Sequence, residues 1–173
     1  MFLVSALIGQ RDTWCVTHNP SGATYPLMDI SHIRELRQRG FSFYSHTRSH
    51  ADLPIFDDQQ LNDELAGARA ELETLLGEEV PYLAYPYGRY DERVLQAAGA
   101  AGYRAAFSVQ PGFNRRDIDR FRLRRLDVFG IDSAAVLARK ITLGSNDGSL
   151  AHNLRYKASR VLARLGLNAD QRP

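Results

Sequence analysis

Residues 40 to 50 read Gly-Phe-Ser-Phe-Tyr-Ser-His-Thr-Arg-Ser-His, with histidines at His46 and His50. The aromatic run after Gly40 predicts a buried strand, so the histidines follow the carboxyl end of that strand. Two imidazoles four residues apart can bind one metal ion from a single turn or tight loop, and α/β proteins build their sites at this end of the strands. The same spacing also arises by chance, so a metal site and an accidental pair remain open alternatives.

Composition predicts one globular domain. The chain has 173 residues, of which 44% are hydrophobic, which is enough for a proper core. Its 22 basic residues are balanced by 20 acidic ones, so we expect no nucleic-acid partner. The single cysteine, Cys15, excludes an internal disulfide and a cysteine-rich zinc site, which leaves His, Asp and Glu as candidate metal ligands.

The chain contains no apolar run of membrane-spanning length. Its opening residues, 1–9, are apolar but lack the basic start of a signal peptide, and they predict a strand. We therefore expect a cytoplasmic location for the chain as written, whereas an upstream signal peptide would change that expectation. A chain that begins inside a core strand is also expected to lack the first part of its domain.

Strands and helices are predicted to alternate along the chain. The apolar and aromatic runs predict strands over 2–7, 41–45, 80–85, 103–109 and 122–128. Helices are predicted to begin at Asp29, at Asp57 or Asp58, at Asp91 and at Asp132, and to end at Gly40, Gly77, Gly102 and about Ile141. We expect the charged face of the second helix to be solvated. Crossovers of helical length favour parallel strands and an α/β layer or barrel fold.

The last segment, 146–173, is predicted to be a basic amphipathic helix and tail that follows a domain over 1–145. Its apolar stripe runs through Leu154, Ala158, Val161, Leu162 and Leu165, with arginines and a lysine between them. Such a helix can make peripheral contact with a membrane surface, or it can pack on its own domain, as apolar stripes of terminal helices usually do.

A second predicted strand ends in a site-like turn, Tyr85-Pro86-Tyr87-Gly88. Taken without the histidines, this would be an ordinary aromatic-lined turn. The histidine segment and the turn, in this order and spacing, resemble the NodB-type polysaccharide deacetylases, carbohydrate esterase family 4. That family combines a His-Ser/Thr-x-x-His metal motif with a later Pro-Tyr/Phe-Gly motif. The resemblance covers about residues 1 to 130 and implies a partial, distorted (β/α) barrel.

The resemblance implies a metal-dependent carbohydrate N-deacetylase, a hydrolase of the carbon–nitrogen bond in acetamido groups on a poly- or oligosaccharide or glycan precursor. His46 and His50 would hold a divalent ion, usually zinc, and both would have to be neutral to bind it. Thr47, between them, would orient the loop through a hydrogen bond.

The resemblance also assigns roles within the turn. The backbone N–H of Tyr87 would be the oxyanion donor, which stabilises the charge that develops on the substrate carbonyl. Tyr85, Pro86 and Gly88 would form the substrate-binding turn around it.

The sequence departs from the family pattern in its acids. The Asp-Asp pair that ends the first barrel strand, and supplies a general base and a metal ligand, is absent. Asp52 is conceivable as a substitute ligand, and Leu150-Ala151-His152 is the one textual match to the family's late general-acid motif. His18 and His32 are expected to be a loop histidine and a helix-surface histidine.

Two histidines are a thin ligand set, so we expect weak metal binding and impaired activity. The alternative is a non-catalytic remnant of the same fold that binds a glycan or a partner. In either case a missing first strand would leave a sheet edge open, and a homodimer could cover it.

Overall fold

The computed structural model describes residues 1–14, 22–148, 151 and 154, which fall into two compact units. Unit 1 comprises Met1–Ser108 and Arg116–Leu123, and unit 2 comprises Val109–Arg115 and the chain from Arg124 onward. Cys15, His18, His152 and most of the predicted C-terminal helix lie outside the described residues, so the expectations for them stay predictions.

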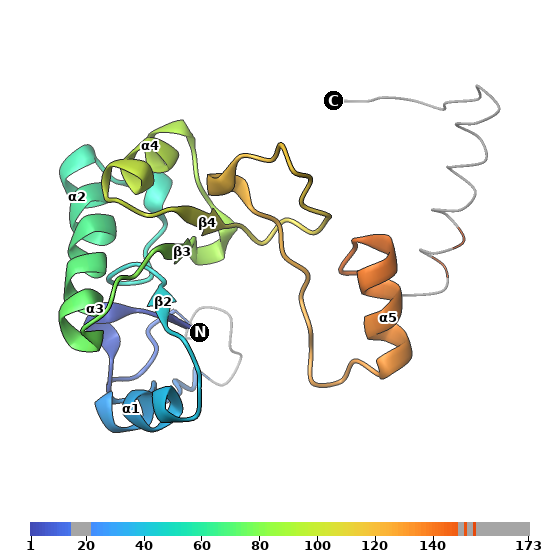
Figure 1. Ribbon diagram of the computed structural model, residues 1–173, viewed down its shortest axis with the longest axis horizontal. Helices are drawn as coiled ribbons and strands as arrows, with labels where there is room; N and C mark the ends of the chain where they lie inside the picture. The colour runs from blue at the N-terminus through green and yellow to red at the C-terminus, as the bar shows by residue number, and fades with distance from the viewer. Residues whose placement is uncertain (15–21, 149–150, 152–153, 155–173) are drawn as a thin grey trace. The chain divides into compact units, whose positions relative to one another are not determined.

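A four-stranded parallel sheet forms the centre of unit 1 (Figure 1). Its strands are β1 (Phe2–Leu3), β2 (Tyr44–Ser45), β3 (Tyr82–Ala84) and β4 (Ala105–Phe107), and they lie side by side in sequence order. Each pairs with the next in parallel: Leu3 faces Ser45, Ser45 faces Leu83, and Leu83 faces Ala106. Parallel strands in sequence order, with helices in the crossovers, are the arrangement of a (β/α) barrel, and here they form part of one.

The helices of unit 1 are α1 (Ile30–Gln38), α2 (Asp58–Asn62), α3 (Ala68–Leu76) and α4 (Glu92–Ala100). All but α3 begin directly after a predicted capping residue. The side chains of Asp29, Asp57 and Asp91 each accept a hydrogen bond from a backbone N–H of the first turn, and Asp57 forms a full capping box with Gln60. A π-helical segment, Asp63–Gly67, joins α2 to α3 without a break in the helix.

Two predicted strands and one predicted helix start are corrected. The first strand stops at Leu3, because Ser5–Leu7 turns into a 3-10 helix whose backbone follows the histidine loop. The strand predicted over 122–128 is reduced to one parallel bridge between Phe107 and Leu123. Asp132 does not cap α5 (Ala134–Leu143), since Ser133 takes that place.

The core of unit 1 joins the sheet to the helices. α3 and α4 contribute Leu72 and Val94, and the strands contribute Leu83 and Ala106, all with no exposed surface. Further members come from the segments between them: Leu3, Ile33, Phe43, Leu53, Leu61, Leu65, Val80, Ala98 and Tyr103. Burial of these side chains fixes the order of the strands, and hence brings the strand ends together.

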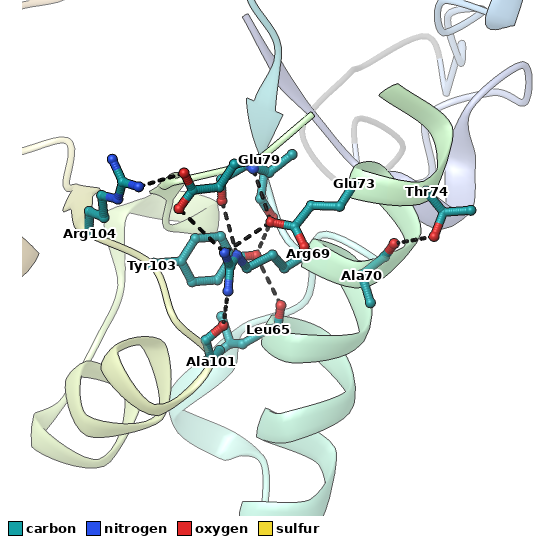
Figure 2. Close-up of polar contacts among 11 residues, drawn as sticks. Leu65, Arg69, Ala70, Glu73, Thr74, Glu79, Ala101, Tyr103 and Arg104 are labelled. Carbon is teal, nitrogen blue, oxygen red and sulfur yellow. Dashed lines mark hydrogen bonds and ion pairs between the residues drawn. The ribbon is translucent and has the colours of Figure 1, made fainter. Parts of the chain in front are cut away.

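Arg69, on α3, ties the helices to the sheet (Figure 2). Its guanidinium donates to Ala101 O at the end of α4 (3.0 Å) and to Val80 O before β3 (3.3 Å), and it pairs with Glu73 (2.9 Å). These bonds satisfy backbone carbonyl groups that lie just outside α4 and β3.

In unit 2, α5 packs around a buried ion pair. Lys140 Nζ lies 2.7 Å from the Asp132 carboxylate and donates to Asp127 O (3.1 Å), and it sits 4.7 Å from the centre of the Phe129 ring. Asp132 therefore neutralises a buried cation instead of capping the helix. None of the helices in the described ranges is both long and apolar enough to span a bilayer.

Candidate functional site

The carboxyl ends of β2 and β3 bring the two predicted motifs together. His46 follows β2 directly, and its ring centre lies 4.8 Å from that of His50, with the rings nearly perpendicular at 82°. His46 Nδ1 lies 2.7 Å from Ala84 O, at the end of β3. Because a carbonyl oxygen only accepts, Nδ1 is the donor in this contact, which leaves Nε2 as the nitrogen of His46 that could bind a metal ion.

His50 lies in an aromatic cage and is only 9% exposed. Trp14 stacks on its ring at 4.1 Å, and the Tyr87 ring meets its edge at 4.8 Å. Its Nδ1 is buried, without a hydrogen-bond partner in the described part of the chain. Burial, and to a lesser degree the neighbouring His46, lower the pKa of His50 to about 4, so its imidazole is neutral at pH 7.

The backbone of both motifs is strained. Among the described residues, only Thr47, His50 and Tyr87 have a positive φ without being glycine, at 66°, 63° and 57°. Each such residue lowers the stability of the folded state by roughly 1–2 kcal/mol, and backbone strain of this kind is often found at functional sites. The Thr47 hydroxyl accepts a hydrogen bond from His50 N (3.2 Å), which is the orienting bond that the sequence led us to expect.

A buried glutamate holds the histidine loop from the helix side. Glu64, on the π-helical segment, accepts hydrogen bonds from Arg48 N and Ser49 N, both at 3.0 Å, and from Ser49 Oγ at 2.5 Å. Glu64 is only 8% exposed, so the expectation that the charged side chains of this helix are solvated is wrong for this residue. The signal for it was its place on the apolar stripe, three residues after Leu61 and four before Ala68.

The Pro86–Gly88 turn follows β3 as a short 3-10 helix. Pro86 is buried, whereas Tyr87 is 45% exposed and presents its ring to His50. Tyr85 is fully buried, and its hydroxyl donates to Phe121 O (3.1 Å). The Tyr85 side chain thus packs in the core and, like that of Pro86, has almost no exposed surface, whereas the substrate-binding role given to this turn stays a prediction.

The acids near the histidines do not complete a ligand set. Asp52 forms an ion pair with Arg89 (2.6 Å). This pair links the segment after the histidine motif to the segment after the Pro86–Gly88 turn. No group of three metal-type side chains exists in the ranges that the structure describes, so Asp52 does not stand with His46 and His50 as a third ligand. His32 lies on the surface beside Asp29 (2.8 Å), as expected.

The residues present fit a divalent ion in part. His50 offers a neutral ring with an orphaned buried nitrogen, and His46 has its tautomer fixed by Ala84 O. Borderline-soft ions such as zinc favour nitrogen ligands of this kind. A catalytic zinc usually has three protein ligands, of which these histidines could provide two.

The imidazole pair and the adjacent turn thus lie at one edge of a parallel sheet, and comparison with known proteins gives the family. The family model described as polysaccharide deacetylase matches residues 2–106. The chain belongs to the polysaccharide deacetylase family.

Individual relatives agree with this assignment. The protein YxkH of Bacillus subtilis (strain 168), assigned by name to the polysaccharide deacetylases, is 32% identical over 96 residues, which are 56% of this chain and 34% of that protein. The crystal structure of BC0361, a polysaccharide deacetylase from Bacillus cereus, is 31% identical with a TM-score of 0.54, and the match covers 58% of this chain and 32% of that one. The chain thus spans about a third of the length of these two relatives.

A more distant structure shows the fold alone. IcaB from Ammonifex degensii is 20% identical with a TM-score of 0.61, and the match covers 75% of this chain and 55% of that one. The family match ends at residue 106, so the predicted domain limit at 145 stays a prediction.

Proposed function

We propose that this chain carries the metal-binding part of a carbohydrate N-deacetylase, which hydrolyses acetamido groups on a poly- or oligosaccharide. The observation that supports it best is the pair of histidine rings, 4.8 Å apart, one of them kept neutral by burial at His50, beside the Tyr87 turn with its positive φ in a member of this family.

In this proposal His46 and His50 hold a divalent ion, most simply zinc. When bound, the ion supplies a Lewis acid for the substrate carbonyl and a site at which water is activated. The protein residues do the positioning. Ala84 O keeps the proton of His46 on Nδ1, and Trp14 and Tyr87 enclose the ring of His50 and exclude water from it.

The Tyr87 peptide has a separate role. We propose that its N–H donates to the carbonyl oxygen of the acetamido group as negative charge develops there. The positive φ of Tyr87 supports this role, because a strained residue kept at a strand end is typical of an oriented backbone donor. The buried Pro86 fixes the turn on the core side.

Acetate release from a β-1,4-linked N-acetylglucosamine pentamer tests this function. We expect the zinc-loaded chain to release acetate slowly, since the described residues provide two ligands, and we expect a chelator or His46→Ala to abolish the release. His32→Ala is the matched control, because it removes a histidine that lies on the surface. Release that persists in His46→Ala would refute the proposed site.

A second candidate is a non-catalytic, glycan-binding form of the same fold. It is favoured by the absence of a third metal-type side chain near the histidines in the described ranges. Under it, the pentamer binds in calorimetry and no acetate appears at any zinc concentration. A chain that neither binds the pentamer nor releases acetate contradicts both candidates for this class of glycan.

A further inference from the structure

We propose that Glu64 is a positioning residue, whose carboxylate holds the histidine loop in the conformation that brings His50 to His46. The inference rests on the proposed function only where it concerns metal affinity. Its structural part concerns the loop itself and can be measured without metal.

The contacts of Glu64 lie at the point where the loop is most strained. Arg48 and Ser49, whose N–H groups donate to Glu64 at 3.0 Å, are the two residues between Thr47 and His50. Both of those flanking residues have a positive φ. One carboxylate thus binds the two consecutive peptides that the strained residues enclose.

The hydrogen bonds to Glu64 oppose the backbone strain of the loop. A positive φ at a residue other than glycine destabilises the folded loop, and Thr47 and His50 both have one. Glu64 accepts two hydrogen bonds from the backbone between them and one from Ser49 Oγ, and bonds of this kind stabilise the conformation that makes them. Without the Glu64 carboxylate, we expect the loop to relax toward ordinary φ values.

The helix is shaped to deliver this carboxylate. Glu64 lies in the π-helical segment Asp63–Gly67, which carries a wider turn between α2 and α3. Adding or removing one residue in a helix rotates all later side chains by about 100° around the helix axis. The wider π turn therefore sets the rotation of α3 relative to α2, so that the apolar faces of both helices point to the core. Single π turns are frequent at functional sites.

Glu71 provides a matched comparison on the same helix. It accepts from Arg48 Nε (2.8 Å) and from Ser5 Oγ (2.6 Å), so it also contacts the loop. Its partners are side chains, and no backbone N–H of the loop is among them. Removal of Glu71 therefore takes away a carboxylate near the loop but leaves the hydrogen bonds from the Arg48 and Ser49 amides to Glu64 in place.

The first experiment measures hydrogen exchange at the Arg48 and Ser49 amides in the metal-free chain by NMR. We expect Glu64→Ala to speed exchange at these two amides by at least about 10-fold while core amides such as Leu83 are unchanged, since about 1.4 kcal/mol corresponds to a factor of ten. Glu64→Gln keeps a carbonyl oxygen that can accept both bonds, so it should restore most of the protection, and Glu71→Ala should match the wild type.

The second experiment titrates each variant with Co²⁺ and records its visible absorption, which reports ligand geometry. We expect Glu64→Ala to weaken Co²⁺ binding by about 10- to 100-fold, the usual effect of losing a residue that orients a ligand. Glu64→Gln should stay within a few-fold of the wild type, with the wild-type spectrum.

Each outcome bears on the proposal. Unchanged exchange in Glu64→Ala, or equal effects of Glu64→Ala and Glu71→Ala, would overturn it. If the wild type binds no Co²⁺, the metal site of the proposed function fails, and the exchange measurement alone tests the positioning role. If Glu64→Ala does not fold, Glu64→Asp replaces it: the charge remains, but the side chain is one methylene too short to reach both amides, so the same loss of protection is expected.

Discussion

Tyr87, Thr47 and His50 are the described residues other than glycine that have a positive φ, and all three belong to the two motifs that the sequence singled out. The motifs were visible because residue types and spacing are properties of the sequence. The strain and the buried Glu64 were not, because both depend on which peptide groups meet after folding. A charged residue on an apolar stripe was the single local sign of Glu64.

Backbone strain at Tyr87 predicts an inverted preference between alanine and glycine. In ordinary positions alanine is more stable than glycine by about 0.4–1 kcal/mol. At Tyr87, φ is 57°, so we expect Tyr87→Gly to be more stable than Tyr87→Ala by about 1 kcal/mol in urea unfolding. Both variants lose the same ring, so their difference isolates the backbone. The same pair of substitutions at Gln59, in α2, should favour alanine. The strain is disproved if alanine is also preferred at Tyr87.

At the scale of elements, helix starts were more predictable than strand limits. A helix start depends on one local side chain, as Asp29, Asp57 and Asp91 show. A strand exists only where a neighbour pairs with it. The alternating residues from Arg122 onward therefore predicted a strand, yet only Leu123 forms a bridge to Phe107. The prediction that Asp132 caps a helix was also wrong, because its carboxylate pairs with Lys140 and Ser133 caps the helix instead.

The Arg69 contacts predict how much the helices depend on one side chain. Arg69→Met keeps much of the length and removes every donor, which leaves Ala101 O and Val80 O without their bonds. We expect the free energy of unfolding to fall by about 2 kcal/mol, as for hydrogen bonds to charged groups. Arg69→Lys should recover only part of this, because one ammonium group cannot span the same acceptors.

Arg104→Met is the control for this measurement. Its guanidinium pairs with Glu79, but the side chain is 64% exposed, so the loss should stay below about 1 kcal/mol. Equal losses at Arg69 and Arg104 would contradict the role given to Arg69. Zinc affinity should be the same in both variants, because neither arginine contacts the histidine loop.

At the scale of the whole molecule, the parallel order of strands joins residues that are far apart in sequence. His46 and Tyr87 come from neighbouring strand ends, and the alternation of predicted elements was sufficient to expect this. The division into two units was not predictable, since residues 116–123 belong with the first unit and 109–115 with the second. No local sequence pattern marks the points at which the chain passes from one unit to the other and back.

All candidate site residues belong to unit 1. A chain that ends at Leu123 should therefore keep its zinc affinity within about 2-fold of the full chain, because affinity follows the ligands and the groups that orient them. Isothermal titration of both chains checks this. A loss of more than about 10-fold in the shortened chain would show that unit 2 takes part in the site.

The central claim is that His46 and His50 together hold a metal ion, and a zinc titration of the full chain tests it most directly. We predict one zinc ion per chain, a loss of affinity of more than about 100-fold in His46→Ala and in His50→Ala, and no change in His32→Ala, since removal of a ligand should exceed the effect of removing a group that orients one. Zinc binding that survives both substitutions, or a wild-type chain that binds no zinc, would contradict the claim.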